Sequence, residues 1–397
     1  MNTESQTAPA RTETGTWTGT FARLFRFDAR AYSMIGAVVL IWTFFSLMHE
    51  RFLTPTNLSN LFLQMSVTSI LAIGMVLVIV AGQIDLSVGS LVGLTGGIAA
   101  VLNVWYDWDP VSVVLVTIAL GSLIGLMQGW IVAYLAVPAF IVTLGGMLMF
   151  RGILLGTTKS VTVAPLDPSL KAIGQDYLPE FLGWIAGAVG VIGTAVIVLG
   201  SRWRRKRYGF KVAPLSISVL RIALIGAFIL GAVWVLNSYK GFPIPFIIVI
   251  VLALLFTFIS RNTVFGRQIY AIGGNPEAAR LSGIPIRRRI LMVFVLCNTL
   301  AAIAGIVLTA RVNAATMSAG TMYELDAIAA CVIGGTSLMG GTGTVTGAIL
   351  GALIMVSLDN GMSIMNMESF WQYIVKGAIL ILAVYMDISS RRRKKAA

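Results

Sequence analysis

The sequence predicts an all-α polytopic membrane protein, a bundle of about twelve transmembrane segments. Three observations support this fold class: the composition, the lengths of the apolar segments and the positions of the basic residues. Of the 397 residues, 57% are apolar and only 11% are charged, whereas a typical soluble domain has roughly 25% charged residues. A single soluble core of this size could not bury so much apolar surface. A lipid bilayer tolerates that surface, so the chain belongs in a membrane.

The apolar segments have the lengths that membrane crossings need. A helix requires about 20 mainly apolar residues to cross the hydrocarbon core. The candidate segments are 31–48, 61–82, 86–104, 111–134, 138–157, 181–200, 217–236, 243–260, 290–311, 323–338, 341–358 and 371–387. The tenth of these is short and carries Glu324 and Asp326, so we expect it to be broken or re-entrant.

The basic residues of this chain, whose net charge is +13, gather in four clusters between long apolar stretches. The clusters are the N-terminal tail (Arg11, Arg23, Arg26, Arg30), Arg202 to Lys211, Arg261 to Arg289, and Arg391 to Lys395. With twelve crossings and a cytoplasmic N-terminus, all four lie in the cytoplasm, as the positive-inside rule requires. The opposite loops collect acids, namely Asp107, Asp109, Asp167, Asp176, Glu180 and Glu368. We therefore expect both termini in the cytoplasm and no binding of nucleic acid.

Glycine is spaced for helix packing. Gly121, Gly125 and Gly129 recur every four residues, as do Gly89, Gly93 and Gly97 and also Gly343, Gly347 and Gly351. Small residues at this spacing let helices approach closely in lipid. We interpret them as packing seams within one subunit, with dimer contacts as the alternative.

Two glycine-rich turns resemble one another within the chain. Residues 80–93 (VAGQIDLSVGSLVG) and 332–347 (VIGGTSLMGGTGTVTG) each join two apolar segments with the same membrane orientation. Parallel repeats are common in transporters. Chance enrichment in glycine is the alternative explanation.

The polar segment Tyr270 to Arg289 lies between two apolar segments on the positive side. Pro276 suits the first turn of a short helix, and Glu277 favours the positive end of that helix. Gly283 would end the helix and Pro285 would prevent its continuation. The residues alone leave open whether this helix lies in the lipid headgroups or docks on a partner.

These residues also resemble a known family. Glu277-Ala278-Ala279 followed by Gly283 resembles the cytoplasmic loop of ABC importer permeases, although the hydrophobic-proline part of the full motif is missing. Residues 82–90 (GQIDLSVGS), 273–283 (GGNPEAARLSG), 323–341 (YELDAIAACVIGGTSLMGG) and 371–387 (WQYIVKGAILILAVYMD) are similar to the ribose/xylose branch of bacterial sugar permeases. The stretch 181–240, with two extra segments, and 357–365 (SLDNGMSIM) are similar to its D-xylose members.

The resemblance implies a function, partners and a domain organisation. It implies a ten-helix permease core plus two helices, in one membrane domain over 31–390, with cytoplasmic tails at 1–30 and 391–397. It further implies a multi-pass protein of the bacterial inner membrane that carries a pentose, D-xylose, with a separate ABC ATPase subunit and a periplasmic sugar-binding protein. Two permease copies would pair in the membrane lipid. The loop that couples to the ATPase would comprise Gly273, Gly274, Asn275, Glu277, Ala278, Ala279, Arg280 and Gly283.

Ionisable groups in or near the apolar segments are candidates for the translocation pathway, because an unpaired charge in hydrocarbon costs several kcal/mol. Asp85 either caps the following helix, by accepting from the N–H of Ser87 or Val88, or lines the pathway with Ser87. Glu324 and Asp326 either bind sugar hydroxyls or face water outside the membrane. Asn360 is a further candidate. For Arg151 and Lys376 we expect the side chains to reach the interface rather than pair with a buried acid.

The sequence offers no catalytic, cofactor or metal site. His49 is the single histidine, and Cys297 and Cys331 both lie in apolar runs. The segment Gly152 to Ser160 fails as a phosphate loop because two threonines separate Gly156 from Lys159. We therefore expect no enzyme and no nucleotide site in this chain. The alternatives are a permease for ribose or another monosaccharide, a secondary sugar transporter, a facilitator channel and a membrane enzyme.

Overall fold

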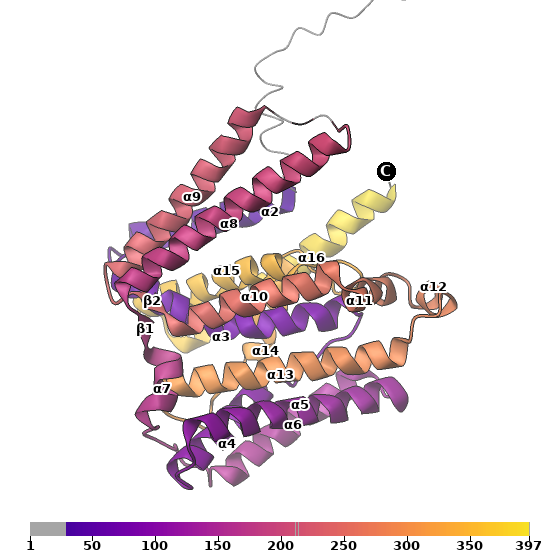
Figure 1. The fold of residues 1–397 in the computed structure, drawn as a ribbon. Coiled ribbons are helices and arrows are strands. Elements are labelled where there is room, and N and C mark those ends of the chain that lie inside the picture. Colours follow the sequence, from indigo (N-terminus) through magenta and orange to yellow (C-terminus); the bar gives the residue numbers. More distant parts are fainter. Residues whose placement is uncertain (1–28, 211, 213, 397) are drawn as a thin grey trace, which may run out of the picture.

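The protein folds into a bundle of helices that run along a common direction (Figure 1). The structure is a computed structural model and describes residues 29–210, 212 and 214–396. Residues 1–28, which include Arg11, Arg23, Arg26 and nearly all of the expected N-terminal tail, lie outside the described residues. So does Lys211 of the second basic cluster.

The elements follow in this order: α2 Ala29–Met48, α3 Pro55–Val80, α4 Val88–Val104, α5 Pro110–Tyr134, α6 Ala139–Thr157, α7 Pro168–Gln175, β1 Tyr177–Leu178, α8 Glu180–Arg207, α9 Leu215–Asn237, β2 Phe242–Pro243, α10 Ile244–Asn262, α11 Val264–Gly274, α12 Pro276–Leu281, α13 Ile286–Val312, α14 Tyr323–Ile333, α15 Val345–Ile364 and α16 Ser369–Ala396. Each of the twelve expected apolar segments corresponds to a helix. The prediction of a helical polytopic membrane protein is therefore confirmed.

The described helices differ in their capacity to cross a membrane. Nine of them are long and apolar enough: α3, α5, α6, α8, α9, α10, α13, α15 and α16. The apolar part of α2 (Ser33–Met48) and the apolar helix α4 are both shorter than these nine helices. α14 has only 11 residues, because Gly334 and Gly335 follow it and Gly335 adopts a φ of 84°. The tenth segment is therefore broken after Ile333, as the sequence predicted.

Local chemistry sets the helix starts. α3 begins six residues before the expected position because Thr54 caps it and Pro55 occupies its first turn. α5 begins at Pro110, and the Asp109 carboxylate accepts a hydrogen bond from the Ser112 N–H at 2.9 Å. That hydrogen bond lowers the pKa of Asp109. Both starts carry a polar cap outside the apolar run, which hydropathy alone does not detect.

A short antiparallel pair of strands was not predicted. In β1 and β2, Tyr177 pairs with Pro243 and Leu178 with Phe242. These strands flank the stretch 181–240, which forms the paired helices α8 and α9 (Figure 1). The strand pair closes the base of this helical hairpin.

The core surrounds α3, which is buried along nearly its whole length and packs against α13, α15, α10 and α14. A glycine seam joins α5 to α13. Methyl groups on Gly121, Gly125 and Gly129 would lie 2.5–2.9 Å from atoms of α13. Cβ atoms in proteins essentially never approach other atoms so closely, so only glycine allows this packing. The interpretation of these three glycines as a packing seam within the subunit is confirmed.

The bundle has two distinct ends, which position the candidate sites. The end formed by α11 and α12 lies opposite α7, β1 and β2 (Figure 1), and we call these the α12 end and the α7 end. α11 and α7 were not predicted, because each has fewer than a dozen residues and lies between apolar segments. α12 was predicted and is present.

Candidate functional site

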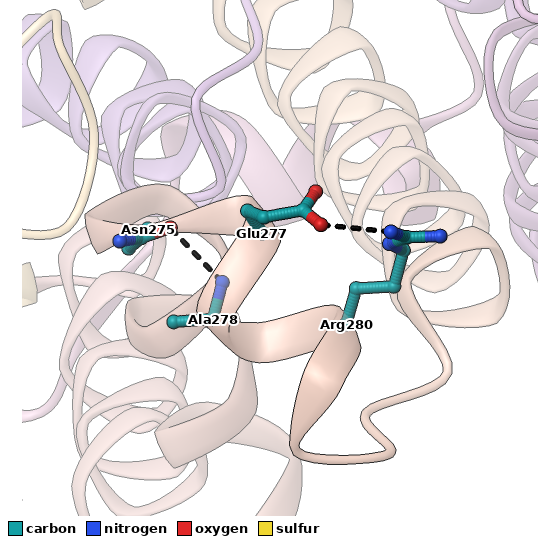
Figure 2. A network of polar contacts seen from close by, with 4 residues as sticks. All are labelled: Asn275, Glu277, Ala278 and Arg280. Atoms are coloured by element: carbon teal, nitrogen blue, oxygen red, sulfur yellow. Dashed lines mark hydrogen bonds and ion pairs between the residues drawn. The ribbon is translucent and has the colours of Figure 1, made fainter.

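The predicted loop helix α12 is built as its sequence suggests. Pro276 occupies its first turn, and the side chain of Asn275 accepts a hydrogen bond from the Ala278 N–H at 3.0 Å (Figure 2). This cap satisfies one of the N–H groups that a helix start leaves unpaired. Asn275 also terminates α11, so the two short helices follow one another with a single residue between them.

Gly283 terminates α12 in the left-handed conformation, with a φ of 75°. The Gly283 N–H donates to Arg280 O at 3.0 Å and the Ile284 N–H donates to Ala279 O at 3.1 Å. This pair of hydrogen bonds is the Schellman arrangement, which favours glycine because it has no Cβ. The predicted role of Gly283 as the helix terminator is confirmed.

The outer face of α12 is open to a partner. Glu277 and Arg280 form an ion pair at 2.7 Å with more than 65% of each side chain exposed (Figure 2). An ion pair this exposed contributes little stability. Leu281 is 78% exposed, whereas Ala279 is buried. α12 therefore rests on the bundle through one small residue and presents an apolar side chain beside two opposite charges.

The two glycines at the end of α11 differ in their surroundings. A methyl group on Gly273 would overlap the carbonyl oxygen of Val80, whereas one on Gly274 would meet no atom within 4 Å. A side chain at Gly273 would thus point into the bundle and one at Gly274 would point away from it, although the Gly274 backbone also lies against Gly341. The sequence GGN does not distinguish the two.

Asp85 and Ser87 lie in the connection between α3 and α4 and are fully buried. The Asp85 carboxylate accepts hydrogen bonds from the Ser87 N–H at 2.8 Å and from the Ser87 hydroxyl at 2.6 Å. The predicted hydrogen bond to Ser87 at the start of α4 is thus present. The second carboxylate oxygen, Oδ2, is buried without a partner among the described residues.

A polar network continues from Ser87 into the core. Gln128 of α5 donates to the Ser87 hydroxyl at 3.0 Å, and Asn298 of α13 donates to Gln128 Oε1 at 2.7 Å. All three side chains are buried. Sequence reasoning missed Gln128 and Asn298, although an amide within an apolar segment is a signal, since a buried amide requires hydrogen-bond partners.

Lys376 forms a partly buried ion-pair cluster with two acids. Its ammonium group lies 3.0 Å from Asp326 Oδ2 and 2.8 Å from Asp359 Oδ2. This cluster joins α14, α15 and α16, beside a cavity of about 50 Å³. The expectation that Lys376 reaches the interface was wrong. The Asp326 carboxylate is buried and paired with Lys376, so binding a sugar hydroxyl would require this pair to open.

Glu324 and Arg151 are not part of that cluster. The Arg151 guanidinium donates to the carbonyl oxygens of Met317 and Ala319 at 3.0 and 2.9 Å, and to the Thr321 hydroxyl at 2.9 Å. Arg151 thus stabilises the connection that precedes α14, and its partners are backbone carbonyls and a hydroxyl rather than a buried acid. Glu324 packs beside Gly89 of α4.

Asn360 forms a reciprocal amide pair with Asn57, in which each side chain donates to the other, at 2.8 and 3.1 Å. Asn57 lines an open cleft of about 550 Å³ at the α7 end. The other residues of the cleft are His49, Arg51, Thr54, Thr56, Asn60, Ser363, Ile364 and Asn366. Asn360 itself is buried beneath this cleft.

The structure brings together some of the predicted residues and separates others. Asp326 and Asn360 lie in the same region, because Lys376 binds both Asp326 and Asp359, the residue before Asn360. Asp85 lies elsewhere, in the turn between α3 and α4 that passes the end of α11. In the part of the chain that the structure describes, no three metal-binding side chains gather.

The comparisons with known proteins agree with these observations. The family described as "Branched-chain amino acid transport system / permease component" matches residues 57–384. The xylose transport system permease protein XylH of Escherichia coli K12 is 50% identical over 377 residues, covering 94% of this chain and 96% of its own. XylH of Haemophilus influenzae is 48% identical, covering 92% and 98%.

A more distant relative is the ribose import permease protein RbsC of Escherichia coli K12, which is 38% identical over 89% of this chain and 92% of its own. No solved structure matches the chain. The helical membrane fold, the exposed loop helix and the near-complete coverage of these relatives agree, and the chain belongs to the permease-component family of transport proteins.

Proposed function

We propose that this chain is the membrane-spanning permease subunit of an ABC importer in the bacterial inner membrane, and that its substrate is D-xylose. The single observation that carries the importer mechanism is α12, a capped six-residue helix that exposes Leu281 on an otherwise polar face. The substrate assignment rests on the two xylose permeases at 50% and 48% identity, against 38% for the ribose permease. Ribose or another monosaccharide is the alternative substrate.

In this proposal α12 is the coupling helix that docks on a separate ATPase subunit. An apolar side chain that is 78% exposed in a polar setting is typical of a contact surface, because burying it in a partner's cleft is favourable. A helix lying in headgroups would need an apolar face along its length. α12 offers one large apolar side chain, Leu281, beside the small Pro276 and Ala278, since Ala279 already faces the bundle. These contacts favour a protein partner.

We further propose twelve crossings with both termini in the cytoplasm. The nine long helices would be joined by α2, α4 and α14. At about 1.5 Å per residue, the 11 residues of α14 span about 16 Å, roughly half of the hydrocarbon core. Residues 334–344 would therefore complete this crossing as non-helical backbone, which is tolerated where it is buried in protein.

The partners follow from this orientation. The α7 end would face the periplasm, and its exposed acids Asp109, Asp167 and Glu180 would contact the sugar-binding protein. Two copies of the chain would pair around a shared pathway in the membrane lipid. Asp85, Ser87, Glu324, Asp326 and Asn360 stay candidates for that pathway, which would require a rearrangement, because Asp85 and Ser87 are buried here.

A proton-coupled sugar transporter is the second candidate, because the cluster of Lys376 with Asp326 and Asp359 is a specific observation in its favour. Asp359 lies within α15, five residues before the last residue of that helix. Proton coupling requires a buried carboxylate that changes its protonation state. The energy source therefore distinguishes the two candidates.

Transport by purified components tests the proposal. Sealed vesicles that hold the ATPase and ATP inside and the xylose-loaded binding protein outside should accumulate xylose, and vesicles without ATP should not, because the separate ATPase supplies the energy. The chain alone should neither hydrolyse ATP nor transport. Xylose accumulation by the chain alone under a pH gradient would establish the second candidate, and accumulation of ribose in place of xylose would change the substrate.

Topology is tested by cysteine labelling. Arg205 of α8 and Asp176 after α7 are both exposed, whereas the native Cys297 and Cys331 are buried. A cysteine at Arg205 should react with a membrane-impermeant thiol reagent only from the cytoplasmic side, because it lies in a basic cluster. A cysteine at Asp176 should react only from outside. Labelling of Arg205→Cys from outside would overturn the proposed orientation.

A further inference from the structure

Three backbone segments meet at the base of α12, at the α12 end of the bundle. The first is the end of α11, Gly273–Gly274. The second is the last turn of α3, with Val80 and the first glycine turn (residues 81–87). The third is the second glycine turn (residues 334–344), which joins α14 to α15. The two glycine turns belong to the segments whose sequences resemble one another, and the contact between Val80 and Gly341 joins these segments.

The contacts among these segments are backbone to backbone. The Gly341 N–H donates to Val80 O at 2.9 Å, which satisfies a carbonyl that the end of α3 leaves unpaired. Gly273 lies against both partners, because a methyl group on it would overlap Val80 O and lie 2.7 Å from the Gly341 nitrogen. The Tyr270 hydroxyl of α11 adds a hydrogen bond to Gly343 O at 2.8 Å.

We call the contact of Gly273 with Val80 and Gly341 the junction. It is connected to α12 with almost no intervening chain. Asn275 directly follows Gly274 and caps α12 through its hydrogen bond from Ala278. A displacement of α12 is therefore imposed on Gly273 two residues earlier. Backbone atoms in direct contact have no rotamers with which to absorb a displacement, and packed interiors transmit strain.

The two glycine turns lead to the elements that carry the buried polar groups. The first leads from the central helix α3 through Asp85 and Ser87 to α4, and the second joins α14, which carries Asp326, to α15, which carries Asp359 and Asn360. Movement of the junction therefore acts on both groups of candidate pathway residues.

We propose that Gly273 is a positioning residue that transmits the motion of the coupling helix, through its contacts with Val80 and Gly341, to both glycine turns and thereby to α3, α14 and α15. This inference rests on the proposed function of α12 as the coupling helix. It assigns to Gly273 a role that its neighbour Gly274 does not share.

The test compares Gly273→Ala with Gly274→Ala, two identical changes at adjacent positions of one helix end. An added methyl meets no atom within 4 Å at Gly274 but overlaps Val80 O at Gly273, so only Gly273→Ala should separate the junction. For this variant we expect normal insertion, normal co-purification of the ATPase and unchanged basal ATP hydrolysis. Xylose uptake should fall about tenfold or more, and so should the stimulation of ATP hydrolysis by the xylose-loaded binding protein. A change of this size is typical of substitutions that lie between two coupled sites. Gly274→Ala should match the unaltered protein.

A second variant covers the case in which Gly273→Ala fails to insert. Tyr270→Phe removes the hydrogen bond to Gly343 without adding an atom to the contact, and should lower stimulated hydrolysis about threefold with basal hydrolysis unchanged. Full coupling in an inserted Gly273→Ala, or full coupling in Tyr270→Phe when Gly273→Ala is not inserted, overturns the inference. If Gly283→Val in α12 also couples normally, the coupling role of α12 itself fails, which is a distinct outcome.

Discussion

Replacing Gly283 by valine is expected to abolish most xylose uptake while the protein inserts at its normal level. Gly283 adopts a φ of 75° at the end of α12, and a residue with a Cβ pays about 1–2 kcal/mol in that conformation. A helix of only six residues has few contacts to offset that cost, so its end unwinds and Leu281 is displaced. The fold as a whole loses little, because nothing lies within 4 Å of the added group. Uptake and hydrolysis stimulated by the loaded binding protein are the measurements.

Gly283→Asn is the matched control for this prediction. Asparagine tolerates the left-handed conformation far better than valine, and both side chains point into open space. We therefore expect Gly283→Asn to retain most of the uptake. Equal uptake by the valine and asparagine variants would contradict a role for the shape of α12. Equal loss in both would indicate that the partner contacts the glycine itself.

Replacing Lys376 by methionine is expected to cause the largest loss of stability among single substitutions of charged residues. The change leaves the buried Asp326 and the partly exposed Asp359 without their counter-charge, and breaking a buried ion pair by removing one partner costs about 3–5 kcal/mol. Because this cluster joins α14, α15 and α16, we expect α16 to detach first. Thermal unfolding of the purified protein in detergent, with protease cleavage within α16 as a local probe, measures the effect.

Two control variants distinguish lost charge pairing from lost packing. Lys376→Met combined with Asp326→Asn and Asp359→Asn removes all three charges and should restore most of the stability, since uncharged replacements of buried ion pairs are often neutral. Arg280→Gln breaks the exposed pair with Glu277 and should change the stability by less than about 1 kcal/mol. A Lys376→Met protein as stable as the original would refute the prediction.

Much of the fold was predictable because it depends on signals local in the chain. Apolar length predicted every long helix, and Pro276 with Gly283 predicted both ends of α12. The break in the tenth segment was predicted from its shortness and from Glu324 and Asp326, and the structure places it at Gly334 and Gly335. The helix starts at Pro55 and Ile286 were placed six and four residues too late, because polar capping residues and arginines continue a helix beyond the apolar run.

The pairing of charged and polar groups was not predictable in the same way. Asn57 and Asn360 are 303 residues apart and Lys376 is 50 residues from Asp326. Hydropathy assigns each of these residues an unfavourable free energy of transfer into the membrane and takes no account of a partner on another helix. Whether a lysine reaches the interface or binds two acids depends on which helices become its neighbours.

The sequence by itself determined the membrane environment, the long helices and the boundaries of the loop helix, because these follow from hydrophobic length and from backbone preferences of proline and glycine. Only the tertiary structure decided at which of two adjacent glycines a side chain would meet the bundle and which acids bind Lys376. Lipid provides little hydrophobic drive for one helix to prefer another. Helix neighbours are therefore selected by close backbone approach and by buried polar pairs, and both arise only when distant segments come together.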